Sequence, residues 1–197
     1  MKLIINKISI FIFILIFLNS FKLSANDIYE FQIEGISLGD SLLNYFSEKE
    51  IIENRKYYNE EDDFLTSEFY IENIDSNYDL LSVYYKKNDE SYTVYQVSGT
   101  IFYDENISQC YSMQKMIVKN ISEILNNAEA IYDELTDEDG FFTFSATELN
   151  SGIIEVSCYD WSNYIENEFN WVDHLSVTIE NNEFSDWIDS IDTTYSN

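Results

Sequence analysis

Proline is absent from the 197-residue chain, histidine occurs once, and cysteine occurs twice. His174 cannot complete a zinc site alone, because structural zinc sites need four cysteine or histidine ligands. Cys110 and Cys158 lie too far apart in the sequence for a redox-active CxxC motif. Isoleucine, asparagine and tyrosine are abundant, which together with the lack of proline indicates an AT-rich genome. The composition therefore excludes a zinc-binding module and a thioredoxin-like enzyme.

Basic side chains are also scarce, with 10 lysines and arginines against 37 aspartates and glutamates, a formal net charge of −27. Phosphate recognition needs basic patches, so the chain is not expected to bind nucleic acid or an anionic membrane surface. An acidic surface favours cationic partners or divalent ions, or serves only for solvation. Aromatic and branched aliphatic residues are plentiful throughout, which argues against intrinsic disorder.

The N-terminus has the pattern of a signal peptide. Lys2 and Lys7 precede an apolar run over residues 8–18, and Ala25 offers a small residue for cleavage. We predict a signal peptide at 1–25 and a single domain at 26–197, with export to the periplasm or secretion. No cysteine lies near the cleavage point, which argues against a lipid anchor, and no stable membrane insertion is expected after cleavage. An uncleaved anchor is the alternative.

The predicted domain is α+β, with an antiparallel sheet and helices packed on one face. Alternating apolar residues predict strands at 28–33, 68–72, 80–85, 92–103, 141–149, 153–159 and 175–179. Helical spacing predicts two short helices joined by a turn at Ser47, a long helix over about 108–134, and a C-terminal helix over 183–191. Residues 161–172 read as an aromatic, polar loop.

The two cysteines predict a disulfide bond, because an exported chain meets an oxidising compartment. Cys110 lies in the first turn of the long helix, and Cys158 lies near the end of a strand expected beneath it. The bridge would close a loop of about 48 residues and contribute roughly 4 kcal/mol in the chain-entropy model. Two free buried thiols are the alternative.

Residues 35–39 read Gly-Ile-Ser-Leu-Gly, a GxSxG pattern between a predicted strand and a predicted helix. His174 lies downstream with acids between, which makes Ser37 and His174 candidates for a small serine hydrolase. The pattern follows the first strand, however, and lacks an upstream glycine-rich oxyanion loop. Helix capping by Ser37 with Asp40 explains the same residues, as does a structural or surface role for His174.

An acidic turn that ends at Gly140 resembles a calcium-binding loop, with Asp137 and Asp139 as metal candidates. Aligning Gly140 with the EF-hand glycine puts Leu135 and Ala146 at ligand positions, so an EF-hand is excluded. A looser acidic site would make the chain a calcium-dependent interaction protein. A solvated turn is the simpler interpretation, and no cofactor is expected.

A cluster of aromatic residues follows the last cysteine: Tyr159, Trp161, Tyr164, Phe169 and Trp171. Such rings form a sugar-stacking or partner-binding platform, or they cap the open edge of a core. We predict Trp161, Tyr164 and Trp171 as binding residues.

The stretch 33–43 and the framework of residues 98–103, Cys110 and 158–161 resemble uncharacterised exported proteins of AT-rich marine bacteria over most of the chain. That resemblance implies export and no known activity. The Gly-Ile-Ser opening is also distantly similar to outer-membrane-assembly lipoproteins of the SmpA type, although the lipidated cysteine of that family is missing. This second resemblance implies an assembly factor.

The leading hypothesis is a non-enzymatic exported acidic domain that binds a protein or a small ligand. The serine hydrolase and the calcium-dependent interaction protein are the alternatives.

Overall fold

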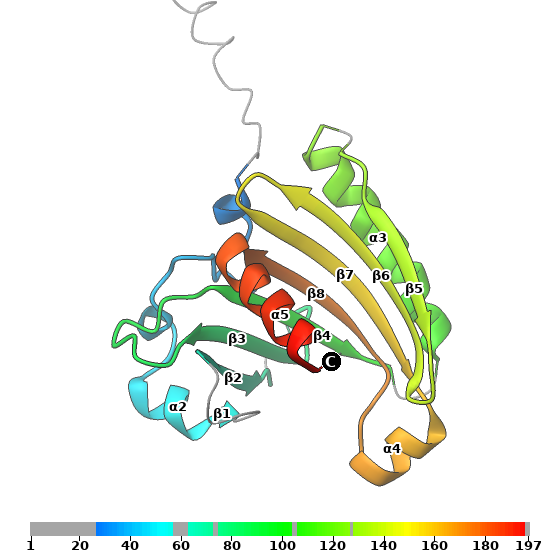
Figure 1. Ribbon diagram of the computed structural model, residues 1–197, viewed down its shortest axis with the longest axis horizontal. Helices are drawn as coiled ribbons and strands as arrows, with labels where there is room; N and C mark the ends of the chain where they lie inside the picture. The colour runs from blue at the N-terminus through cyan, green and yellow to red at the C-terminus, as the bar shows by residue number, and fades with distance from the viewer. Residues whose placement is uncertain (1–26, 57–62, 73–74, 104–105, 127, 196–197) are drawn as a thin grey trace, which may run out of the picture.

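The structure is a computed structural model that describes residues 27–56, 63–72, 75–103, 106–126 and 128–195. The predicted signal peptide at 1–25 lies outside these residues. The described chain contains an eight-stranded sheet in which every neighbouring pair is antiparallel, in the order β1-β2-β3-β4-β8-β7-β6-β5 (Figure 1). The strands are β1 (Arg55–Lys56), β2 (Phe64–Tyr70), β3 (Leu80–Lys86), β4 (Gln96–Phe102), β5 (Ile131–Thr136), β6 (Gly140–Leu149), β7 (Gly152–Trp161) and β8 (His174–Asn181).

Successive side chains of a strand point to opposite faces, so the sheet has two chemically different sides. One side, the core face, carries the valines of four adjoining strands: Val83, Val97, Val177 and Val156. The other side, the open face, carries serines at neighbouring positions: Ser82, Ser98, Ser176 and Ser157. The alternation therefore gives an apolar layer on one side and a hydroxyl-bearing layer on the other.

The core face is covered by two segments from different parts of the chain. Residues 27–53 bring buried apolar side chains to it, among them Ile28, Leu42 and Ile51. They include two 3-10 turns, η1 (Ile28–Glu30) and η2 (Leu42–Asn44), and α2 (Glu48–Glu53), which begins at the predicted Ser47. The helix α3 (Ile107–Ile124) covers the far half, where it contacts β7 and β8.

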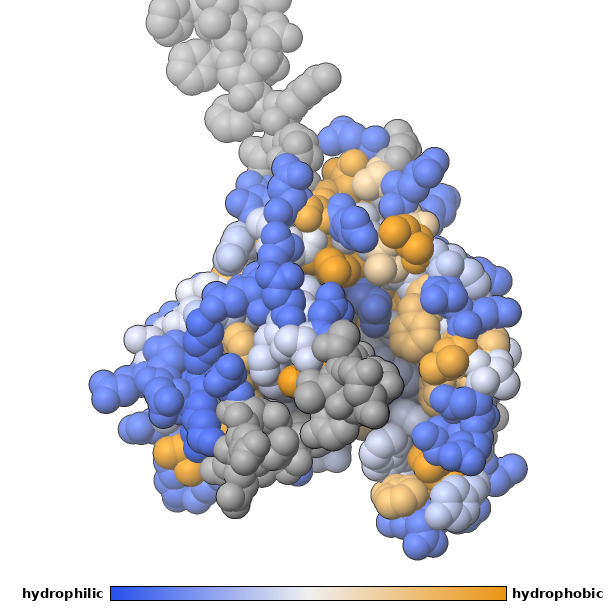
Figure 2. All heavy atoms as spheres, in the orientation of Figure 1, coloured by the Kyte–Doolittle hydropathy of each residue, from blue (hydrophilic) through white to orange (hydrophobic). Residues whose placement is uncertain are grey.

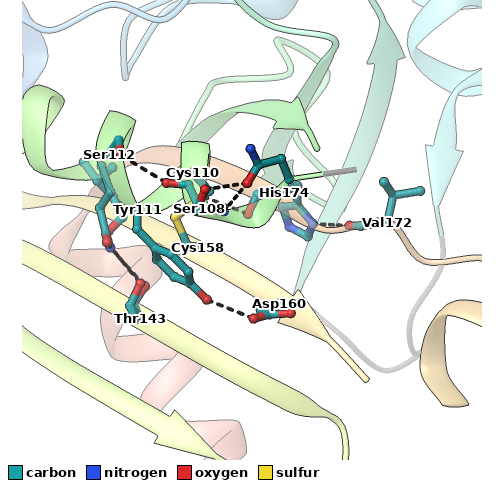
Figure 3. Close-up of a disulfide and its surroundings, with 12 residues drawn as sticks. Ser108, Cys110, Tyr111, Ser112, Thr143, Cys158, Asp160, Val172 and His174 are labelled. Carbon is teal, nitrogen blue, oxygen red and sulfur yellow. Dashed lines mark hydrogen bonds between the residues drawn. A yellow bond between two sulfur atoms is a disulfide. The ribbon is translucent and has the colours of Figure 1, made fainter. Parts of the chain in front are cut away.

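The predicted disulfide pins the start of α3 to the sheet (Figure 3). Cys110 and Cys158 are both fully buried, and their Cα atoms lie 6.0 Å apart. One turn later, the Gln114 amide donates to the carbonyl oxygens of Thr143 and Val156, at 3.1 Å and 2.8 Å. The Thr143 hydroxyl donates back to the Gln114 carbonyl oxygen at 3.0 Å. The helix is thus fixed to β6 and β7 by one covalent bond and three hydrogen bonds.

The α+β class is confirmed, but the long helix is shorter than predicted. It ends at Ile124, because Leu125 caps it and Asn126 adopts a left-handed backbone conformation with φ of 56°. Residues 131–134, predicted as its last turn, belong to the edge strand β5 instead. Its side chains are exposed on both faces, so no alternating pattern marked it as a strand.

The N-terminal strand predicted at 28–33 is also wrong. Asp27 accepts a hydrogen bond from the Tyr29 backbone N–H and starts η1 in its place. The strand predicted over 92–103 begins only at Gln96, because Tyr92 has a positive φ of 48°. Residues 161–172, predicted as a loop, contain the short helix α4 (Asn163–Phe169).

The last helix, α5 (Asn182–Tyr195), packs on the open face. This corrects the prediction that it shares one face of the sheet with α3. It follows β8 without a connecting loop, and its Phe184 contacts Tyr84 and Phe64, which point to the open face. In Figure 1, α5 lies across the front of the sheet, while α4 projects beyond the far end of β7. The open face is therefore bounded by helices at both ends.

Candidate ligand-binding groove

A groove of about 730 Å³ crosses the open face. Figure 2 shows the molecule hollowed between α5 and the part that carries α4. The groove is lined by side chains from β1, β2, β3, β4, β7 and β8 and by residues 170–172, which follow α4. Its volume falls within the roughly 300–1,000 Å³ that is typical of small-ligand sites.

Hydroxyl groups form the middle of the groove floor. The Ser98 hydroxyl lies 2.7 Å from that of Ser176 and 3.0 Å from that of Thr178. The register of β4 and β8 places these residues side by side, although about 80 positions separate them in the sequence. Each hydroxyl has one hydrogen to donate and two lone pairs to accept with, so the cluster keeps capacity for further hydrogen bonds.

Three polar atoms around this floor have no partner. Thr66 Oγ1 and Gln96 Oε1 are buried without a hydrogen bond within the described part of the chain, and so is Trp161 Nε1. Thr66 is 1% exposed and Gln96 is 7% exposed, and all three residues line the groove. Gln96 Oε1 can only accept a hydrogen bond, Trp161 Nε1 can only donate one, and the Thr66 hydroxyl can do both.

Aromatic rings gather at the end of the groove nearest α4. Tyr159 stacks on His174 with ring centroids 4.6 Å apart, and on Trp161 at 5.7 Å. Trp171 meets Trp161 at 4.5 Å and a steep interplanar angle of 70°. The two indoles thus form a corner, and Trp171 remains 51% exposed.

His174 is held in one tautomer at this end of the groove. Its Nδ1 lies 2.8 Å from the backbone oxygen of Val172, which can only accept, so Nδ1 carries the proton (Figure 3). Burial lowers the pKa of His174 below its usual 6.5, and the bond to Val172 opposes this shift only in part. The imidazole is therefore neutral at pH 7, with Nε2 as an acceptor.

The groove has little net charge, although the protein as a whole is acidic. Lys56 and Glu68 face each other across β1 and β2, with Nζ and Oε2 3.8 Å apart. Among the described residues that line the groove, no other lysine, arginine, aspartate or glutamate is present. A neutral ligand therefore fits the groove better than an ionic one.

Two of the predicted binding residues meet at this site. Trp161 and Trp171 both line the groove, whereas Tyr164 points from α4 to the surface, is 66% exposed and lies outside the lining. Tyr164 contacts only Phe169 among the described rings. The sequence revealed the aromatic end of the groove but not the hydroxyl floor, whose only signal was the alternation of serine and threonine along β4 and β8.

The hydrolase candidates are not brought together. Ser37 lies in the N-terminal segment on the core face, between the buried Ile36 and Leu38, and its backbone N–H donates to Asp40. His174 lies on the open face, so the sheet separates the two side chains. No helix begins at Ser37, since the first helical segment after it, η2, starts at Leu42.

The metal candidates serve a turn. Asp137 Oδ1 accepts hydrogen bonds from the backbone N–H groups of Asp139 and Gly140, which closes the hairpin between β5 and β6. Within the described ranges, no cluster of three acidic, histidine or cysteine side chains is arranged to hold a metal ion. A solvated turn accounts for these residues.

Comparison of the chain with protein-family models, with curated proteins and with solved structures gives no match. The resemblances noted in the sequence therefore remain predictions. In the part of the chain that the structure describes, no helix is long and apolar enough to cross a membrane.

Proposed function

We propose that the protein is an exported binding module that holds a small ligand in the open-face groove. The observation that carries this proposal is the set of unpartnered atoms of Thr66, Gln96 and Trp161 around one hollow. A buried polar atom without a partner costs roughly 1–3 kcal/mol. A ligand with hydroxyl or amide groups would supply the missing hydrogen bonds once these side chains turn their polar atoms towards the groove.

The exported location is supported by the disulfide between Cys110 and Cys158. Disulfides persist in oxidising compartments such as the bacterial periplasm and the extracellular space. The predicted signal peptide at 1–25 points the same way. The hydrolase alternative and the calcium alternative find no comparable support, since Ser37 and His174 lie on opposite faces and Asp137 closes a turn.

The proposal is tested by blocking the groove. Ser82 lies on its floor, so Ser82→Trp would fill the space, whereas Ser112→Trp puts the same side chain on the exposed side of α3. Thermal unfolding would be followed with saccharides, amino acids, nucleosides and fatty acids. A ligand at a hundred times its Kd should raise Tm by roughly 5–10 °C in the wild type and in Ser112→Trp. The shift should vanish in Ser82→Trp, and a shift that persists there would contradict the proposal.

A further inference from the structure

We infer that the ligand of the groove is a neutral carbohydrate, an inference that rests on the proposed binding function. Three polar atoms without hydrogen-bond partners belong to residues that line the groove. Gln96 Oε1 requires a donor, Trp161 Nε1 requires an acceptor, and the Thr66 hydroxyl can take either. A hydroxyl group is both, so a molecule bearing several hydroxyls satisfies all three with one kind of group.

The floor of the groove is rich in hydroxyl groups. Ser98, Ser176 and Thr178 hydrogen-bond to one another, and their hydrogens are free to rotate between partners. Such a floor can donate to or accept from the hydroxyls of a ligand without moving a strand. An aliphatic chain laid over it would instead leave the buried oxygens of Thr66 and Gln96 without partners. This argues against a lipid.

The aromatic corner formed by Trp161 and Trp171 suits a sugar ring. Rings present a negative π face, and the axial C–H bonds of a sugar present a positive apolar patch of similar size. Trp171 offers a half-exposed ring, and Trp161 meets it at 70°. One sugar ring can therefore stack on Trp171 while its hydroxyl edge turns towards Trp161 Nε1 and the floor.

The charge of the groove and of the protein favours a neutral ligand. Lys56 lies close to Glu68, and the imidazole of His174 is uncharged, so the described residues of the lining offer no unpaired cation to a phosphate or a carboxylate. The surrounding protein has a formal charge of −27, which repels anions over a longer range. Nucleotides, sugar phosphates and uronic acids are therefore disfavoured against neutral saccharides.

Calorimetric titration of the oxidised protein tests this inference. The probes are neutral gluco-, galacto-, manno- and N-acetylglucosamine oligosaccharides, with matched oligo-uronates, a fatty acid and an uncharged peptide as comparisons. We expect at least one neutral oligosaccharide to bind, and its uronate counterpart to bind at least about tenfold more weakly.

Three variants locate the bound sugar. Trp171→Ala removes a half-exposed ring and should weaken binding about tenfold without unfolding the protein. Gln96→Leu removes a buried acceptor and should also weaken binding about tenfold. Tyr164→Ala is the matched control, because this ring lies on α4 outside the groove, and it should bind as tightly as the wild type.

The outcomes separate the inference from the function on which it rests. Binding of the fatty acid or the peptide alone, abolished by Ser82→Trp, would overturn the carbohydrate inference and leave the groove as a binding site. Saccharide binding that neither Trp171→Ala nor Gln96→Leu weakens would place the sugar elsewhere and would also overturn it. Failure of every probe to bind would overturn both.

Discussion

The single side chain of Gln114 joins α3 to the sheet. It is 3% exposed, and its amide group makes three hydrogen bonds to Thr143 and Val156. Gln114→Met keeps the shape of the side chain but leaves the Thr143 hydroxyl without its acceptor. We expect the free energy of unfolding to fall by about 2 kcal/mol, measured by urea denaturation.

Gln109→Met is the matched control, because Gln109 lies exposed on the same helix and should change stability by less than about 0.5 kcal/mol. Adding Thr143→Val to Gln114→Met should recover part of the loss, since both partners are then apolar. Equal stability of the two methionine variants would show that the buried amide bonds contribute nothing.

The carboxyl group of Glu180 should make the stability of the protein depend on pH. Burial beneath α5 raises its pKa, the carboxylates of Glu155 and Asp189 add to the rise, and a hydrogen bond from Ser185 opposes it. A group with a raised folded-state pKa stabilises the protein below its unfolded pKa and loses that contribution as the pH rises. At pH 7 the buried charge therefore destabilises the fold.

Glu180→Gln removes this charge while keeping an oxygen to accept from Ser185. The variant should be more stable than the wild type at pH 7, and its advantage should shrink as the pH falls towards 4.5, in urea denaturation at a series of pH values. Glu129→Gln, on an exposed residue, should show no such trend. An advantage independent of pH would contradict the assignment to burial.

The disulfide acts at the scale of the element, because it anchors α3 at its N-terminal turn to β7. The closed loop spans 48 residues, so its loss should lower the free energy of unfolding by about 4 kcal/mol. Urea denaturation of the wild type with and without reductant measures this loss. Replacing both cysteines with alanine should lower the stability to that of the reduced protein and remove the effect of the reductant. An unfolding midpoint of the wild type that is the same with and without reductant would contradict a stabilising disulfide.

Elements with a regular pattern were predictable, and those determined by local backbone geometry were not. The alternation over 141–149 and 153–159 correctly predicted β6 and β7, and Cys110 fell in the first turn of a real helix. The helix was predicted ten residues too long, because apolar residues of β5 continue its spacing by chance. The cap at Leu125 and the left-handed conformation of Asn126 end it.

At the scale of the whole molecule, the groove depends on strand order, which residue patterns do not encode. Ser98 and Ser176 become neighbours only because β4 pairs with β8, and α5 bounds the groove only because it turns onto the open face. The sequence therefore predicted the aromatic rings, which lie close together along the chain. It could not predict the floor, whose hydroxyls come from distant strands.

The proposed sugar site lies at the aromatic corner of the open-face groove. The protein has three tryptophans, two at this corner and Trp187 on α5, outside the groove lining. Their indole N–H signals in an NMR spectrum provide a direct test during titration with neutral oligosaccharides. Signals of Trp161 and Trp171 should shift while that of Trp187 stays in place; a shift confined to Trp187, or no shift at all, would contradict sugar binding at this corner.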